Sequence, residues 1–326
     1  MAKATQVDGL NFDGPASDAI GQVLLVRMEE MCALGEKAVD WNEPENVHNM
    51  RVASRRLRGA AHDFSPYLNS RPLVSPFKSI KKLARALGRV RDFDVTIERL
   101  TRTANKAPED LEGGILEIVA RWNAELEKSR VKLIPWIKSE ALEELRSKFA
   151  IALPSAIKPR KNRKALSANG AEPLTYRQVA KAVILERLTQ FEDLSSSLYR
   201  PLKVKPLHNL RIAAKHLRYA LELFEGGWSS SLAFIAQHVA FIQSALGDVH
   251  DCDIMIEDFG KAALQQVGDT NRQSTSSWLM MSFLEQRDKG LKKSLKQWKR
   301  WQSEAMAAAI RKVVENDSAE NAAGQA

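Results

Sequence analysis

Two segments of the chain carry histidines and arginines at the same spacing. Residues 48–64 read HNMRVASRRLRGAAHDF and residues 208–224 read HNLRIAAKHLRYALELF, with eight of these 17 positions identical. On an α-helix, residues three, four or seven apart share a face, so the basic side chains of each segment form one stripe. The stripes consist of His48, Arg51, Arg55, Arg58 and His62 in the first segment, and His208, Arg211, Lys215 and Arg218 in the second. Arg56 and its counterpart His216 flank them.

This combination of residue types suits the binding of phosphate-rich anions. Guanidinium groups present paired donors that match phosphate oxygens, and lysine adds a compact charge. A solvated helix face usually mixes both signs, since stacked like charges destabilise a helix by a few tenths of a kcal/mol per pair. No carboxylate lies between His48 and Arg58. The stripes therefore predict an anion-binding surface. Because an unperturbed imidazole has a pKa of about 6.5, they also predict binding that strengthens as the pH falls from about 7 to 6.

A second pair of similar segments follows the stripes. Residues 87–100 read LGRVRDFDVTIERL and residues 246–259 read LGDVHDCDIMIEDF, with seven of 14 positions identical. Their aspartates, Asp92 with Asp94 and Asp251 with Asp253, have the spacing to bind Mg²⁺ or to orient nearby basic side chains. We favour the second role, because a magnesium site needs more oxygen ligands than the sequence assigns here.

The helix predicted before the first aspartate pair adds cations on one side. These cations are Lys78, Lys81, Lys82, Arg85 and Arg89. The corresponding stretch of the second half has Gln237, Ser244 and Asp248, which predicts a weaker or differently shaped anion site there. Two further basic runs are open to either interpretation, as part of the site or as solvated surface. They are KPRKNRK at 158–164, and Lys292, Lys293, Lys296, Lys299 and Arg300 near the C-terminus.

The two matches lie 160 and 159 residues apart and occur in the same order, which indicates a tandem duplication. Apolar spacing is helical throughout, so we expect an all-α fold of two pseudo-symmetric four-helix bundles. One domain over 17–314 would comprise repeats 17–150 and 175–314, a basic linker 152–173, and a disordered tail 315–326. Helices are predicted over 17–40, 44–65, 74–104, 112–150, 175–199, 204–225, 229–266 and 273–314, with a kink or break at Pro135.

Composition narrows the class of protein. The 326 residues have a formal net charge of +9, which favours anionic partners. The two cysteines lack CxxC spacing, and no apolar run approaches the roughly 18 residues of a membrane span. No signal peptide, P-loop, HExxH or GxSxG motif is present. We therefore expect a cytoplasmic, non-enzymatic protein with no cofactor, no bound metal and no membrane partner.

With both repeats laid out, the chain resembles the CHAD family of histidine-bearing α-helical domains. The resemblance is carried by HNMRVASRRLR with LGRVRDFDV, and by HNLRIAAKHLR with LGDVHDCDI, and extends over about residues 17–314. It implies two four-helix bundles whose basic residues line a channel or concave surface and bind inorganic polyphosphate, in some bacteria on polyphosphate granules. By resemblance, Lys82, Arg85 and Arg89 are weaker candidates, and the binding roles fall on His48, Arg51, Arg55, Arg58, His208, Arg211, Lys215 and Arg218. Family domains often accompany a triphosphate-handling catalytic domain, which does not appear in this sequence.

Two rival functions stay open at this point. A nucleic-acid protein would interleave aromatic and basic residues so that bases can stack, but only Tyr219 lies next to a stripe. A metal-dependent polyphosphate hydrolase would need the four aspartates as ligands. The sequence does not predict the oligomeric state.

Overall fold

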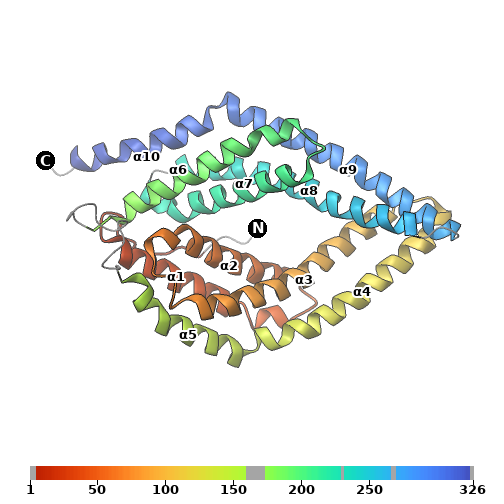
Figure 1. The fold of residues 1–326 in the computed structure, drawn as a ribbon, viewed down its shortest axis with the longest axis horizontal. Helices are drawn as coiled ribbons and strands as arrows, with labels where there is room; N and C mark the ends of the chain where they lie inside the picture. Colours follow the sequence, from red (N-terminus) through yellow and green to blue (C-terminus); the bar gives the residue numbers. More distant parts are fainter. Residues whose placement is uncertain (1–4, 159–172, 229–230, 266–268, 324–326) are drawn as a thin grey trace. The chain divides into compact units, whose positions relative to one another are not determined.

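The computed structural model describes residues 5–158, 173–228, 231–265 and 269–323 (Figure 1). These residues form α-helices and short 3₁₀ helices, and the β-structure among them is one isolated bridge between Pro15 and Thr175. The predicted all-α class is confirmed. The chain divides into two compact units, one of residues up to Asn105 and 116–179, the other of residues 106–115 and 180–326.

The first unit is built from five helices. They are α1 (Ala16–Ala33), α2 (Pro44–Asp63), α3 (Val74–Ala104), most of α4 (Glu109–Ile137) and α5 (Ser139–Ile157), with 3₁₀ turns η1 (Lys37–Val39) and η2 (Ser65–Tyr67). In Figure 1, α2 lies between α1 and α3, and it packs against both. Met50 and Leu57 of α2, and Phe64 directly after it, are fully buried, on the side opposite the basic stripe. Each such side chain stabilises the fold by about 1.5–3 kcal/mol, so burial of the apolar side fixes which side of α2 faces water.

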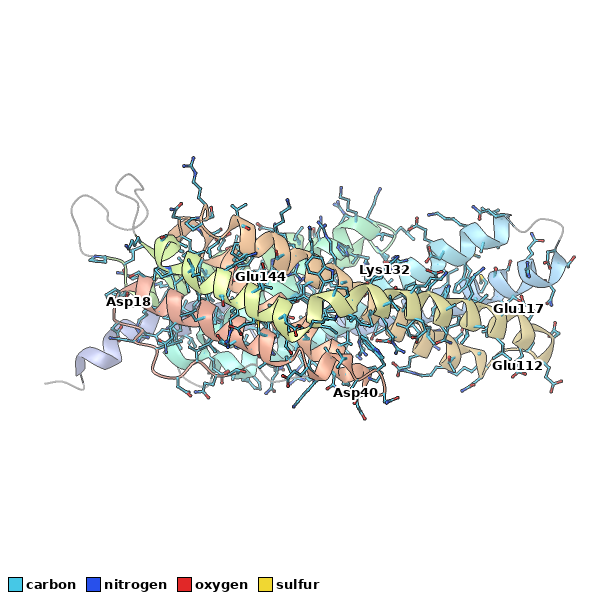
Figure 2. The ribbon with its side chains drawn as sticks, turned by 90° about the horizontal axis from the view of Figure 1, so that it is seen from below. Asp18, Asp40, Glu112, Glu117, Lys132 and Glu144 are labelled. Atoms are coloured by element: carbon cyan, nitrogen blue, oxygen red, sulfur yellow. The ribbon has the colours of Figure 1, made fainter. Side chains whose placement is uncertain are left out.

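The outward faces of this unit are charged, as expected for amphipathic helices. Figure 2 shows Asp18 of α1, Lys132 of α4 and Glu144 of α5 extending from the ribbon into solvent. The helices therefore present mixed charge outside while their apolar stripes meet inside.

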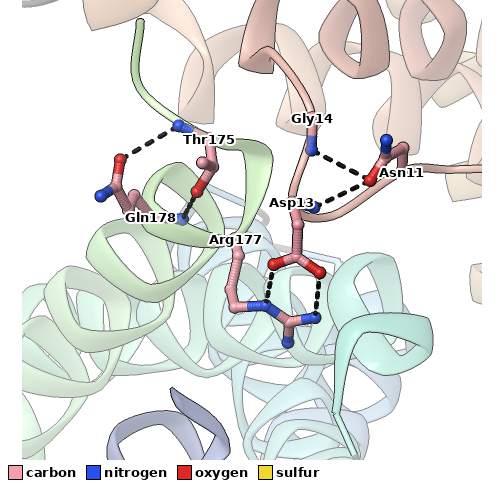
Figure 3. A network of polar contacts seen from close by, with 6 residues as sticks. All are labelled: Asn11, Asp13, Gly14, Thr175, Arg177 and Gln178. Carbon is pink, nitrogen blue, oxygen red and sulfur yellow. Dashed lines mark hydrogen bonds and ion pairs between the residues drawn. The ribbon is translucent and has the colours of Figure 1, made fainter. Parts of the chain in front are cut away.

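The N-terminal segment of the unit is fixed to the start of α6 (Tyr176–Leu194) (Figure 3). Asp13 receives two hydrogen bonds from Arg177, at 2.8 and 3.2 Å, and these bonds hold the pKa of that carboxyl below its usual range. The amide of Tyr176 donates to the Gly14 carbonyl at 3.1 Å, and the Tyr176 ring contacts Phe12. Asp13 and Arg177, which are 164 positions apart, are thereby joined within one unit.

The second unit contains the rest of α6, η3 (Ser195–Tyr199), α7 (Val204–Phe224), η4 (Glu225–Gly227), α8 (Ser231–Gln265), α9 (Thr270–Ser303) and α10 (Met306–Ala323). Helices α8 and α9 run side by side in Figure 1. A Cβ placed on Gly290 of α9 would lie 3.0 Å from a methyl group of Val249, so glycine permits this close approach. Trp298 and Trp301 of α9 pack edge-on against Phe191 of α6.

Helix α8 is the most apolar part of this unit. Among the described residues, only its stretch Leu232–Gln265 is long and apolar enough to cross a membrane, judged by length and composition. Half of its most apolar part is buried within the protein, as in a core helix, and the finding is compatible with a soluble protein.

Four predicted boundaries differ from the structure. Pro135 lies inside α4, and the break comes at Lys138, whose extended backbone (φ −62°, ψ 144°) separates α4 from α5. The predicted helix 273–314 is interrupted at Ala305, which has the left-handed φ of 48°. Helix α5 continues to Ile157, so the expected linker begins later, and its residues 159–172 lie outside the described residues. Helix α10 continues to Ala323 through alanines that favour helix, inside the segment expected to be a disordered tail, while 324–326 lie outside the description.

Candidate anion-binding site

The basic stripe of α2 lies beside α3 in the first unit. His48, Arg51, Arg55 and Arg58 are all half-exposed, while Leu57 on the other side is fully buried. A Cβ placed on Gly88 would lie 3.8 Å from Arg51 Nε, so the arginine extends across α3 at that glycine. Arg51 also donates to Asp92 Oδ1 at 2.9 Å, and Asp92 itself is largely exposed. The stripe is thus partly accessible to solvent along the α2–α3 junction.

His48 lies close to three arginines, Arg51, Arg55 and Arg91. Burial lowers its pKa, and the charges of Arg91, Arg51 and Arg55 lower it further, while Glu45 opposes them. Glu45 itself pairs with Arg91 at 3.1 Å. Among the described residues none forms a hydrogen bond with the buried Nδ1 of His48. His48 is therefore neutral near pH 7 without a ligand, and an added anion would favour its protonated form.

The stripe of α3 presents a row of exposed cations. Lys78, Lys81 and Arg85 are exposed, and no carboxylate among the described residues pairs with them. Arg89 is also exposed and lies 5.0 Å from the centre of the Phe93 ring. These residues recur every three or four positions, so their charges line one side of the helix. Uncompensated charge repeated in this way is available to an external anion.

Aromatic rings lie under several of these cations, which the sequence interpretation missed. Lys82 lies 5.8 Å from the ring of Trp136 on α4, and Arg130 of α4 lies 5.3 Å from the ring of Trp41. Such contacts orient cations and contribute about 0.5–1 kcal/mol each at exposed sites. The Arg89–Phe93 pair has the i,i+4 spacing that sequence can reveal. Trp41 and Trp136 come from other segments, so only the fold brings them to these cations.

The junction of α7 and α8 in the second unit contains a pair of histidines. Nδ1 of His208 on α7 lies 3.3 Å from Nδ1 of His250 on α8. A Cβ placed on Gly247 would lie 3.8 Å from Arg211 Nε, matching the contact of Arg51 with Gly88. Burial and the charge of Arg211 lower the pKa of both imidazoles, and that of His250 reaches about 4. Lys215 is half-exposed beyond them.

These depressed values correct the predicted pH range. The pKa values of His48, His208 and His250 are lowered in the protein without a ligand, so a rise in affinity between pH 7 and 6 requires the bound anion to raise them. Without such an increase, the gain in affinity comes at lower pH.

The paired aspartates hold arginines in both units. Asp94 lies 3.7 Å from Arg130 on α4, and Asp253 accepts a 2.5 Å hydrogen bond from Arg287 on α9. Asp92 pairs with Arg51 of the stripe, as the orienting role predicts, whereas Asp94 and Asp253 pair with arginines outside the predicted site. Among the described residues, no group of three or more His, Cys, Asp or Glu side chains is placed to hold a metal ion.

Two predicted site residues are buried. Arg56 is 9% exposed and pairs at 3.3 Å with Glu30 of α1, which also binds Arg27 at 2.8 Å. Arg218 is 4% exposed and pairs at 3.2 Å with Glu222, one turn further along α7. Carboxylates outside each stripe hold these arginines in the interior, so both act in packing and cannot line the exposed surface. The α9 cations Lys292, Lys293, Lys296, Lys299 and Arg300 are exposed, although Asp288 and Glu304 neutralise two of them.

The CHAD domain profile matches residues 22–259, a range that includes both stripes. The chain belongs to the CHAD domain family. Its fold is similar to the CHAD domain of the plant Ricinus communis, with a TM-score of 0.68 at 20% identity, covering 91% of this chain and 95% of that one. It is also similar to PptA from Streptomyces chartreusis, with a TM-score of 0.66 at 12% identity, covering 88% of this chain and all of the other (100%). At these identities the likeness shows the CHAD fold alone.

Two uncharacterized proteins of Mycobacterium tuberculosis, from strains CDC 1551 and H37Rv, are each 25% identical to this CHAD chain over 266 residues. The match covers 78% of this chain and 47% of each relative. The chain thus spans about half the length of the curated relatives it matches.

Proposed function

We propose that this CHAD protein binds inorganic polyphosphate without catalysing a reaction, through the basic faces of α2 with α3 and of α7 with α8. The observation that carries the proposal is the row of exposed, uncompensated cations Lys78, Lys81 and Arg85 beside the half-exposed stripe of α2. Two packed helices thereby offer a band of guanidinium, ammonium and imidazole donors. A linear chain of phosphates matches such a band, because its charge repeats at short intervals and needs no base-reading contacts.

The same proposal includes an internal repeat of one ancestral helical bundle. Arg51 over Gly88 corresponds to Arg211 over Gly247, at the offsets found in the sequence. Asp94 with Arg130 likewise corresponds to Asp253 with Arg287, each pairing the third helix of the repeat with the fourth. Equivalent contacts in both units favour two pseudo-symmetric bundles, each with its own anion-binding junction.

A nucleic-acid ligand is the second candidate, and one observation favours it. The Lys82–Trp136 and Arg89–Phe93 pairs place aromatic rings within the basic face of the first unit. Stacking of bases on such rings contributes about 1–3 kcal/mol per base in single-strand binders. A polyphosphate hydrolase is disfavoured, because Asp92, Asp94 and Asp253 already bind arginines. A cytoplasmic location on polyphosphate granules would follow from the favoured proposal.

A competition titration at matched phosphate concentration tests the choice. Long-chain polyphosphate, single-stranded RNA and duplex DNA would each displace a labelled polyphosphate from the protein at about 50 and 200 mM salt. We expect polyphosphate to be the best competitor at both salt concentrations. Equal competition by all three polymers, lost together at the higher salt, would show a general polyanion surface instead.

A further inference from the structure

The loop between η3 and α7 exposes apolar and basic side chains together. Leu202 is 89% exposed, Tyr199 58% and Val204 45%. The three charged residues among them are also exposed, and all are cations: Arg200, Lys203 and Lys205. Single exposed apolar residues are ordinary on protein surfaces, but here three occur within six positions.

Contacts within the second unit fix the position of this loop. Arg287 of α9 donates to the carbonyl of Pro201 at 2.7 Å, and Asp253 of α8 holds the same guanidinium at 2.5 Å. Arg200 and Lys203 both form backbone hydrogen bonds in the turns that flank Pro201. Since the backbone of the loop is anchored, the exposure of Leu202 is a feature of the folded unit.

The corresponding loop of the first unit has the opposite charge. At an offset of 160, Arg200, Lys203 and Lys205 match Asp40, Glu43 and Glu45, and Leu202 matches Asn42. Figure 2 shows Asp40 extending into solvent from the first-unit loop. Both loops precede a helix with the same basic stripe, so neither the fold nor the stripe requires cations or leucine at these positions. The cations and the leucine of the second-unit loop are therefore not explained by the fold.

We propose that residues 199–205 dock on the surface of an anionic lipid bilayer. Leu202, with Tyr199 and Val204, enters the interfacial region, while the three cations lie at the level of the lipid phosphates. Residues 194–221 contain no Asp or Glu, so the segment carries no acidic side chain to oppose this approach. Weak apolar insertion and a basic cluster together give reversible membrane binding.

Two other uses of the loop fit these side chains less well. A polyphosphate chain would engage the cations but offers no apolar phase for Leu202. No membrane partner is predicted from the sequence, but a docking loop needs no membrane-spanning segment. The exposure of Leu202, which cannot be predicted from the sequence, is the observation that favours a membrane surface over polyphosphate.

Co-sedimentation with vesicles tests the proposal. The full-length protein should bind phosphatidylglycerol–phosphatidylcholine vesicles and leave pure phosphatidylcholine vesicles unbound. Lys203→Ala/Lys205→Ala should weaken binding by tenfold or more, since each cation near an anionic surface contributes about 1 kcal/mol. Leu202→Ser should weaken it about fivefold through lost insertion. Val39→Ser, which changes the exposed apolar residue of the first-unit loop, is the matched control and should bind as the wild type does.

Polyphosphate titration of the same variants separates this proposal from the proposed function. Leu202→Ser should bind polyphosphate with unchanged affinity and bind vesicles more weakly. This result is expected whether or not polyphosphate is the physiological ligand. If Leu202→Ser retains full vesicle binding, or if neutral vesicles bind equally well, the docking proposal is wrong. Loss of polyphosphate affinity in Lys203→Ala/Lys205→Ala, with vesicle binding unchanged, would instead assign the loop to the polyphosphate site.

Discussion

The two basic stripes of the molecule face very different neighbours. Beside α2, helix α3 carries Lys78, Lys81, Lys82, Arg85 and Arg89, whereas the matching positions beside α7 are Gln237, Ala240, Phe241, Ser244 and Asp248. The arginine-over-glycine contact and the aspartate–arginine pair are nevertheless the same in both units. Contacts of the same kind thus occur in both units, while the charges beside the two stripes differ. Anion binding should accordingly be strong in the first unit and weak in the second.

The most direct test of this difference removes the corresponding pair of cations from each unit. We expect Arg51→Ala/Arg55→Ala to raise the polyphosphate Kd by about 100-fold, since each charge-assisted hydrogen bond contributes about 1.5–3 kcal/mol. Arg211→Ala/Lys215→Ala should raise it by less than about tenfold, because fewer neighbouring cations help to hold the ligand there. Calorimetric titration measures both values. Equal losses in the two variants would mean that the units contribute equally and that the charge on α3 is irrelevant.

The histidine pair of the second unit should make the folded protein less stable at acidic pH. His250 has a folded-state pKa of about 4, below its ordinary value, so its protonation favours the unfolded chain. Stability from this group is complete above about pH 6.5 and is lost as the pH falls toward 4. Because His250 is only half-buried, the loss should be on the order of 1–2 kcal/mol.

Urea denaturation at pH 7.5 and 4.5 measures this loss. His250→Gln should lose less stability than the wild type between the two pH values, since glutamine does not titrate. An identical loss in both proteins would show that the close contact of His208 with His250 does not control acid sensitivity.

Adding cations to α8 at the positions that are basic on α3 would test whether charge explains the difference between the units. Gln237 and Ser244 are exposed on α8 at the positions of Lys78 and Arg85. Gln237→Lys/Ser244→Arg should increase polyphosphate affinity a few-fold, because partly screened surface charges contribute less than about 1 kcal/mol each. Fluorescence anisotropy with labelled polyphosphate detects such a change. Gln237→Ala/Ser244→Ala should have no effect, and an equal gain in that control would exclude charge as the cause.

Much of this arrangement follows from helical periodicity and repeat alignment. The stripe of α2 is open because Met50, Leu57 and Phe64 occupy the opposite side, and the sequence displays that pattern directly. The sequence also places an aspartate pair after each basic stripe, and Asp92 pairs with Arg51. The partners that finally bind them, Arg130 and Arg287, lie on other helices and could be identified only from the fold.

The failures of the sequence interpretation have local causes. Arg56 belongs to the same basic run as Arg55, yet it is buried and pairs with Glu30 of α1. Arg218 is buried against Glu222, a carboxylate that lay just outside the stripe as first defined. The end of α9 depends on the left-handed backbone of Ala305, for which alanine gives no signal. Tertiary contacts override local pattern in each case.

The central claim is that exposed, uncompensated cations on α3 bind a polyphosphate chain. The most direct test is the salt dependence of polyphosphate binding by Lys78→Ala/Lys81→Ala/Arg85→Ala. The control, Arg102→Ala/Lys138→Ala/Lys148→Ala, removes the same charge from exposed positions elsewhere in the first unit. We expect the slope of log Kd against log salt to decrease by about 2 in the first variant only, because each lost phosphate contact changes it by about 0.7. Equal slopes in the two variants and the wild type would contradict the claim.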